Sequence, residues 1–118
     1  MHYLIDAGED TCTQLQFSQN KTHMAKLRNL SVLITHEHAD HYLGLGTFLQ
    51  RYFEEFGLYP AVVCPPLVKE FLQLSGVKCN TVDSMLLIQS PMHLCEHTIT
   101  AFKTNHTEVS VSYLISNG

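Results

Sequence analysis

The sequence predicts one mixed α/β domain, of the α/β or α+β class. Three observations lead to this prediction: strand-like apolar runs alternate with segments of helical periodicity, no linker rich in Pro, Gly or Ser interrupts them, and the chain has only 118 residues. With 45% apolar residues, a chain of this length can bury one core of its own. We therefore expect a single domain over residues 1–118.

The first half of the chain predicts two strands and two helices. A short strand is expected over 2–6, and a helix is expected to begin at 9–11. The run 31–35 is apolar with little alternation, which favours a strand covered on both faces. From 41 to 56 the apolar residues recur every three or four positions, which predicts a helix that Gly57 ends.

The second half predicts another helix and several strands. A short buried strand is expected over 61–64, and Pro65-Pro66 then opens a helix. The expected apolar face of that helix consists of Leu67, Val68, Phe71, Leu72 and Leu74. After Gly76 the pattern becomes β, with strands expected over 77–82, 85–88, 97–103 and 109–115.

Charge and hydropathy exclude several classes of protein. The net charge is −4 and no run of basic residues occurs, so the chain shows no electrostatic footprint for nucleic acid. No apolar stretch is long enough to cross a bilayer, so we expect no membrane partner. The N-terminal residues lack the pattern of a signal peptide, and we expect a cytoplasmic protein.

The cysteines form neither a disulfide scaffold nor a zinc-finger pattern. They are widely spaced, without a C-x-x-C pair, and we expect them to act as small buried apolar residues. His93, Cys95 and His97 form an H-x-C-x-H pattern that could bind a metal. Its spacing matches no structural zinc template, which favours histidines at a surface or strand edge.

The segment 35–42 carries the chemistry. His36, His38, Asp40 and His41 place three imidazoles and a carboxylate within six residues, directly after a predicted buried strand. These ligand types suit Zn²⁺, Mn²⁺ or Fe, whereas Ca²⁺ and Mg²⁺ prefer oxygen ligands alone. Three histidines and a water would form an open, catalytic coordination sphere. The alternative is a solvated helix N-terminus with an accidental run of histidines.

This segment resembles a known family signature. His36-Glu37-His38-Ala39-Asp40-His41 is similar to the H-x-H-x-D-H motif of the metallo-β-lactamase-fold hydrolases, which bind two metals in an αββα sandwich. Leu4-Ile5-Asp6-Ala7-Gly8 looks like the strand-end Asp of that family, and Asn105-His106-Thr107 looks like its next metal-binding His. The resemblance implies that Asp6 orients the ligands through hydrogen bonds. It implies a first metal held by His36, His38 and His106, and a second to which Asp40 and His41 contribute.

Within this family the sequence resembles the ribonuclease Z and phosphodiesterase branch. Residues 6–11, followed by Gln14-Leu15, are similar to the stretch D-x-G-E-x-T-x-x-Q-L of ribonuclease Z. Residues 106–115 resemble the segment of that enzyme from a metal-binding His to G-Y-x-I.

The resemblance implies a metal-dependent hydrolase that acts on phosphodiesters through a dinuclear, zinc-type site. Two Zn²⁺ ions per complete site are expected, with Mn²⁺ or Fe as other candidates, and Asp40 is expected to orient the attacking water. RNA or a cyclic nucleotide would be the substrate. Two alternatives remain open: a thioester or lactone hydrolase on the same fold, and a fragment or subunit that binds metal without catalysis.

The resemblance covers nearly the whole chain but only about the first half of the family's domain. Two family ligands, a metal-bridging Asp and a last His, would lie beyond Gly118. In addition, Asn117-Gly118 is a hairpin-turn signal with no strand after it. We expect a partial domain that forms a homo-oligomer or is completed by further chain. The alternative is a compact domain with frayed ends.

Overall fold

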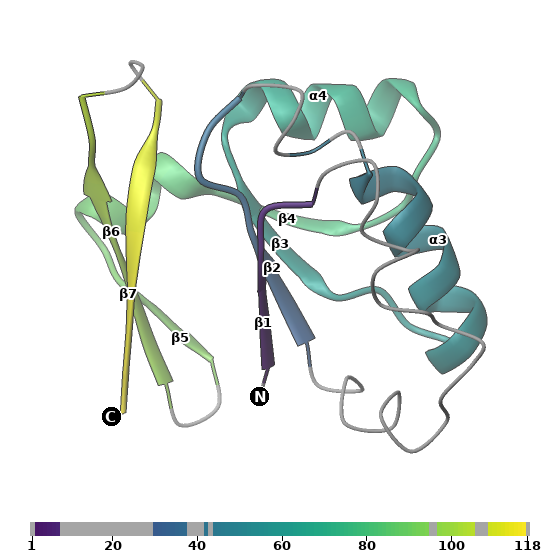
Figure 1. Ribbon diagram of the computed structural model, residues 1–118, viewed down its shortest axis with the longest axis horizontal. Coiled ribbons are helices and arrows are strands. Elements are labelled where there is room, and N and C mark those ends of the chain that lie inside the picture. The colour runs from purple at the N-terminus through teal and green to yellow at the C-terminus, as the bar shows by residue number, and fades with distance from the viewer. Residues whose placement is uncertain are drawn as a thin grey trace.

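The computed structural model describes residues 2–7, 30–37, 42, 44–94, 97–105 and 109–117. Two sheets lie against each other, with helices on the outer face of the first sheet (Figure 1). The elements are β1 (His2–Ile5), β2 (Leu30–Leu33), α3 (Leu45–Phe56), β3 (Ala61–Cys64), α4 (Pro66–Leu74), β4 (Asn80–Asp83), the 3-10 helix η3 (Ser84–Ile88), β5 (Met92–Leu94), β6 (His97–Lys103) and β7 (Val111–Asn117). The predicted mixed α/β class is confirmed.

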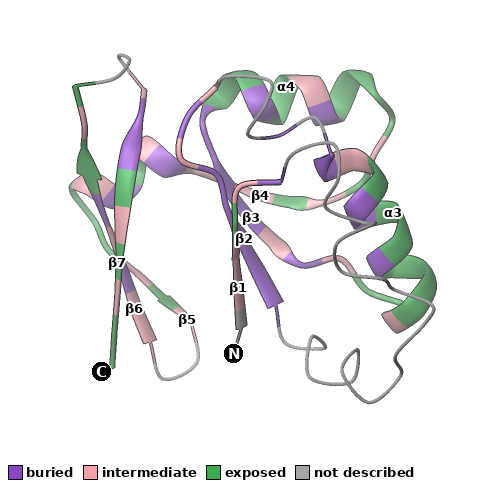
Figure 2. Ribbon diagram, in the orientation of Figure 1, coloured by how far each residue is buried: buried purple, intermediate pink, exposed green. Residues whose placement is uncertain are grey.

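Parallel strands form the first sheet, in the order β1-β2-β3-β4. All four residues of β2 are buried (Figure 2). Successive side chains point to opposite faces of a strand, so Val32 packs in the cluster on the helix side whereas Leu33 packs against the second sheet. The prediction of a strand covered on both faces is therefore confirmed for β2.

Helix α3 covers the first sheet through one apolar stripe. Its buried side chains recur at three and four positions and belong to the same cluster as Val32. At its end, Gly57 adopts φ 71° and donates its N–H to the carbonyl of Phe53 at 2.7 Å, as predicted for the C-terminus. The helix begins at Leu45, four residues later than the predicted start at 41. The buried side chains are Leu45, Phe48, Leu49 and Tyr52.

Helix α4 begins at Pro66 as predicted, but its apolar face is narrower than expected. Val68 and Leu72 are buried, whereas Leu67 is 49% exposed and Leu74 is 89% exposed. Including these last two residues in the buried face was wrong. Leu67 and Leu74 lie seven positions apart on one stripe of the helix. Val68 and Leu72 form the neighbouring stripe, and only this second stripe faces the sheet.

The second sheet is antiparallel, in the order β5-β6-β7. Its inner residues Ile99, Ala101 and Val111 form one cluster with Leu33 and Val63 of the first sheet. The described residues therefore form three layers, with one layer of helices and two sheets.

In the second half of the chain, three predicted strands differ from the structure in type or in bounds. The strand expected over 85–88 is wrong, because the Asp83 carboxylate accepts a hydrogen bond from the Met85 N–H at 2.9 Å and caps a 3-10 helix there. The strand expected over 77–82 lies instead at Asn80–Asp83, since the Val77 N–H is bonded to the carbonyl of Leu72 at the end of α4. The last strand is Val111–Asn117, two residues later than expected.

Strand β5 was not predicted, and the helix expected from 9–11 lies outside the described residues.

No helix in the described part of the chain has the length and apolar character needed to span a bilayer. The extent of the domain over 1–118 stays a prediction.

Candidate metal centre

The candidate site lies at the edge of the first sheet where the parallel strands end. Asp6 follows β1, the segment Ile34–His36 follows β2, and Cys64 and Asp83 are the last residues of β3 and β4. Because the carboxyl ends of parallel strands meet at one edge, residues distant in the sequence converge there.

Asp6 and Thr35 are joined by several hydrogen bonds. The Thr35 N–H donates to Asp6 Oδ1 at 2.8 Å, and the Thr35 hydroxyl lies 3.1 Å from Oδ1 and 2.9 Å from Oδ2. Asp6 adopts a left-handed backbone conformation, with φ 61°, which Asp tolerates better than most residues with a side chain. Its own N–H donates to the carbonyl of Leu33 at 2.9 Å. The turn after β1 thus holds the carboxylate against the end of β2.

His36 lies beside this pair and is only 8% exposed. Its Nδ1 atom is 2.9 Å from the Thr35 hydroxyl, and its Nε2 atom is buried. Histidines that bind metals almost always engage their other ring nitrogen in a hydrogen bond, which orients the ring. The bond from Nδ1 to Thr35 meets this condition, so His36 has the environment of a metal ligand that binds through Nε2.

The second sheet holds the same segment from the other side. The Val111 N–H donates to the carbonyl of Thr35 at 2.8 Å, and the Tyr113 hydroxyl donates to the carbonyl of Ile34 at 2.6 Å. Burial raises the pKa of the Tyr113 phenol, so the hydroxyl keeps its proton. Strand β7 therefore fixes the backbone on which His36 sits.

The β6–β7 connection begins and ends beside this segment. The Thr104 N–H donates to the carbonyl of Ser110 at 3.0 Å, and the hydroxyls of these two residues are also hydrogen-bonded. Ser110 directly precedes Val111, which is bonded to Thr35. The two ends of the connection that contains His106 are thus held together next to the candidate site.

The structure places two of the six predicted site residues. Asp6 and His36 are brought together through Thr35, whereas the other four lie outside the described residues. In the described part, no three His, Cys, Asp or Glu side chains form a cluster suited to a metal ion. The metal-binding roles therefore stay predictions, and the setting of His36 fits them. The four residues outside the described part are His38, Asp40, His41 and His106.

Two residues at the site had no role in the sequence analysis. Thr35 directly precedes the histidine motif, and Tyr113 lies in the segment that resembles ribonuclease Z. The motif position is a signal that could have identified Thr35. The link from Tyr113 to Ile34 joins residues 79 positions apart, and no sequence pattern points to it.

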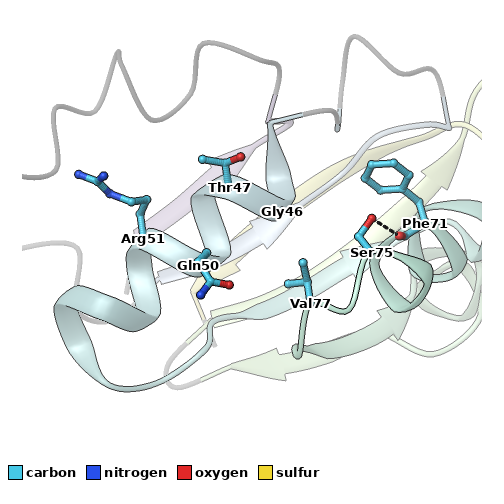
Figure 3. A pocket seen from close by; sticks show the side chains of 7 residues that line it. All are labelled: Gly46, Thr47, Gln50, Arg51, Phe71, Ser75 and Val77. Carbon is cyan, nitrogen blue, oxygen red and sulfur yellow. Dashed lines mark hydrogen bonds between the residues drawn. The ribbon is translucent and has the colours of Figure 1, made fainter.

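Described residues of the first sheet and its helices line two cavities. The larger, of about 410 Å³, lies between α3 and the end of α4 (Figure 3). Its described lining residues include no His, Cys, Asp or Glu, so they offer neither imidazole nor carboxylate to a metal. The smaller, of about 150 Å³, is lined in part by Cys64, Lys69 and Asp83. Burial is the main cause that raises the pKa of Cys64 to about 12, so this thiol keeps its proton at neutral pH in the metal-free protein. The larger cavity is lined by Gly46, Thr47, Gln50, Arg51, Phe71, Ser75 and Val77.

The histidines of the H-x-C-x-H pattern are engaged with other side chains. His93 is exposed, with Nδ1 3.1 Å from the Thr98 hydroxyl. His97 Nδ1 lies 3.1 Å from the Tyr3 hydroxyl across the two sheets. Cys95 lies outside the described residues. His93 thus lies at the surface as expected, whereas His97 is half-buried on the middle strand of the second sheet and contacts β1, which the surface and strand-edge interpretation did not predict.

Comparison with known proteins identifies the family. The family model described as a β-lactamase superfamily domain matches residues 2–117. The chain belongs to the metallo-β-lactamase superfamily. A ribonuclease Z from Methanosarcina mazei is 33% identical over 122 residues, which cover 97% of this chain and 39% of the relative. The chain thus spans about two fifths of the length of this relative.

Solved structures of the superfamily share the fold of this chain. The crystal structure of human tRNase Z, short form, superposes with a TM-score of 0.67 at 22% identity, over 98% of this chain and 54% of that one. A diphosphatase from the PhnP family superposes with a TM-score of 0.64 at 19% identity, over 98% of this chain and 44% of that one. At these identities the superpositions establish the metallo-β-lactamase fold alone, which confirms the predicted fold.

Proposed function

We propose that the protein is a metal-dependent hydrolase of phosphodiester bonds, with a ribonuclease Z-like nuclease as its specific form. The observation that carries the proposal is the setting of His36, a buried imidazole held through Nδ1 at the carboxyl edge of the sheet, within the H-x-H-x-D-H motif. Similarity to a ribonuclease Z supports the choice of substrate bond.

In this proposal His36, His38 and His106 hold a first metal, and Asp40 and His41 contribute to a second. Zn²⁺ suits this donor set, and Mn²⁺ or Fe are other candidates. Two bound ions would supply Lewis acidity for the phosphoryl oxygen and for an attacking water. Asp40 would orient that water by accepting a hydrogen bond from it.

The substrate would be RNA or a cyclic nucleotide, and the chain would work as a homo-oligomer or together with further chain. The net charge of −4 and the lack of basic runs favour a partner or additional segment for any polynucleotide substrate. The chain covers 39% of the ribonuclease Z relative, and this partial coverage supports the same proposal.

The test is metal content followed by hydrolysis. Protein purified without chelators is analysed for bound metal, with His38→Ala as the matched variant, and then assayed on bis(p-nitrophenyl) phosphate and on a thioester. We expect bound zinc that the variant loses, and cleavage of the phosphodiester. Activity on the thioester alone would reject the substrate class. Bound metal without either activity would favour the non-catalytic metal-binding subunit.

A further inference from the structure

Asp6, Thr35 and His36 form a continuous chain of hydrogen bonds at the ends of β1 and β2. The Thr35 hydroxyl lies in the middle, 2.9 Å from Asp6 Oδ2 and 2.9 Å from His36 Nδ1. Both contacts are short enough to be hydrogen bonds. One hydroxyl oxygen thus contacts a carboxylate on one side and an imidazole nitrogen on the other.

The protons in this chain can be assigned by counting donors. A hydroxyl carries one hydrogen, and an ionised carboxylate only accepts hydrogen bonds. Thr35 therefore donates its hydrogen to Asp6, and its oxygen accepts from His36. The hydrogen of the neutral imidazole must then sit on Nδ1, which leaves the lone pair on Nε2.

The main chain of Thr35 is held on both sides, by the Asp6 carboxylate and by the backbone of β7. The Thr35 N–H is bonded to Asp6 Oδ1, and its carbonyl accepts from the Val111 N–H, each at 2.8 Å. Because both main-chain groups of Thr35 are held, its side chain is carried to one place. A hydroxyl held in this way accepts from His36 without having to rearrange.

The geometry points to Thr35 as a positioning residue that, with Asp6, selects the Nδ1–H tautomer of His36 and so presents Nε2 as its metal-binding atom. An imidazole without such a partner favours the Nε2–H tautomer in water, which would block that atom. The metal-binding part of this inference rests on the proposed function, whereas the tautomer is a property of the metal-free protein. The class of ligand that Nε2 would take is a divalent transition metal.

The test measures the tautomer and the metal affinity separately. Protein labelled with ¹⁵N in its histidines is studied by two-bond ¹H–¹⁵N correlation without metal, near pH 8, above the ordinary histidine pKa of about 6.5. The His36 signals are assigned by their loss in His36→Gln. Zn²⁺ affinity is then measured by competition with a chromogenic chelator. Thr35→Val removes the hydroxyl at nearly constant shape, and Thr35→Ser keeps it.

We expect the Nδ1–H pattern for His36 in the wild-type protein and in Thr35→Ser, and its loss in Thr35→Val. We expect Thr35→Val to bind Zn²⁺ about 10- to 100-fold more weakly and Thr35→Ser to stay close to the wild-type value. A residue that serves stability alone would change the unfolding midpoint and leave the tautomer unchanged.

Two outcomes would overturn the inference. An Nε2–H pattern in the wild-type protein would reject the proton assignment, even if Thr35→Val does not fold. Wild-type tautomer and affinity in a folded Thr35→Val would reject the role of the hydroxyl. An Nδ1–H pattern that Thr35→Val loses, in a protein that binds no Zn²⁺, would support the tautomer assignment and reject the proposed function instead.

Discussion

Replacing Tyr113 with Phe removes one hydroxyl and tests how the second sheet holds the metal-site segment. That hydroxyl donates to the buried Ile34 carbonyl at 2.6 Å, and Phe keeps the ring and its packing. Loss of a donor to a buried carbonyl costs about 1–3 kcal/mol. We expect Tyr113→Phe to lower the free energy of unfolding by about 1–3 kcal/mol, because the retained ring keeps water away from the buried Ile34 carbonyl after its donor is lost.

The pH dependence provides an independent check on the same hydroxyl. Burial raises the pKa of Tyr113 in the folded protein, whereas the unfolded chain ionises near the ordinary value of about 10. The stabilisation from Tyr113 is therefore complete below pH 10 and is lost as the pH rises further, by about 1.4 kcal/mol per pH unit. The stability difference between the wild-type protein and Tyr113→Phe should stay constant up to about pH 9 and shrink between about pH 10 and pH 11.

Urea unfolding, followed by circular dichroism, measures both effects. The matched control is Tyr59→Phe, in which the ring that stacks on Phe53 is kept. An equal m-value in all variants would show that the change lies in stability and not in the extent of unfolding. The reasoning is refuted if Tyr113→Phe costs no more than Tyr59→Phe, or if its cost stays constant through the alkaline range.

Three further predictions concern the core, the cysteines and the turn after β1. Leu33→Ala, between the two sheets, should lower the free energy of unfolding by about 2–5 kcal/mol, while Leu74→Ala on the surface should change it by less than about 0.5 kcal/mol in urea unfolding. Iodoacetamide near pH 8 should modify Cys79 faster than Cys64, because Cys64 is buried with a pKa of about 12; equal rates by peptide mass spectrometry would contradict this. Asp6→Ala should lower the free energy of unfolding, measured in urea, by about 1 kcal/mol more than Asp6→Asn does, because Asn tolerates φ 61° better than Ala; the reverse order would contradict it.

Most regular elements could be predicted because their apolar patterns are local. The strand 61–64 and the strand 97–103 occur at the predicted bounds, and helix α4 begins where Pro66 indicated. The run 85–88 could not be assigned in this way, since a short apolar run suits a strand or a buried turn equally. The bond from Asp83 to the Met85 N–H decides it in favour of a 3-10 helix.

Strand β5 shows the limit of local patterns more directly. It has three residues, and its pairing with β6 provides its hydrogen bonds. Three residues are too few to show a periodicity. The structure of this segment depends on its pairing with β6.

The candidate site, too, could be predicted from the sequence only in part. The motif that contains His36 and the resemblance that singled out Asp6 were visible in the sequence, because ligand chemistry restricts residue types at fixed spacings. The contact of the Thr35 hydroxyl with Asp6 was not visible, because it joins positions 29 apart through the pairing of β1 with β2.

The sequence by itself determined the mixed α/β class, the resemblance to the superfamily and the candidate donor types, since these follow from local periodicity and residue chemistry. Only the tertiary structure decided that Thr35 links Asp6 to His36 and that Tyr113 and Val111 hold the same segment from the second sheet. Hydrogen bonds require atoms to approach within about 3 Å. For residues far apart in the sequence, strand register and sheet packing set that approach.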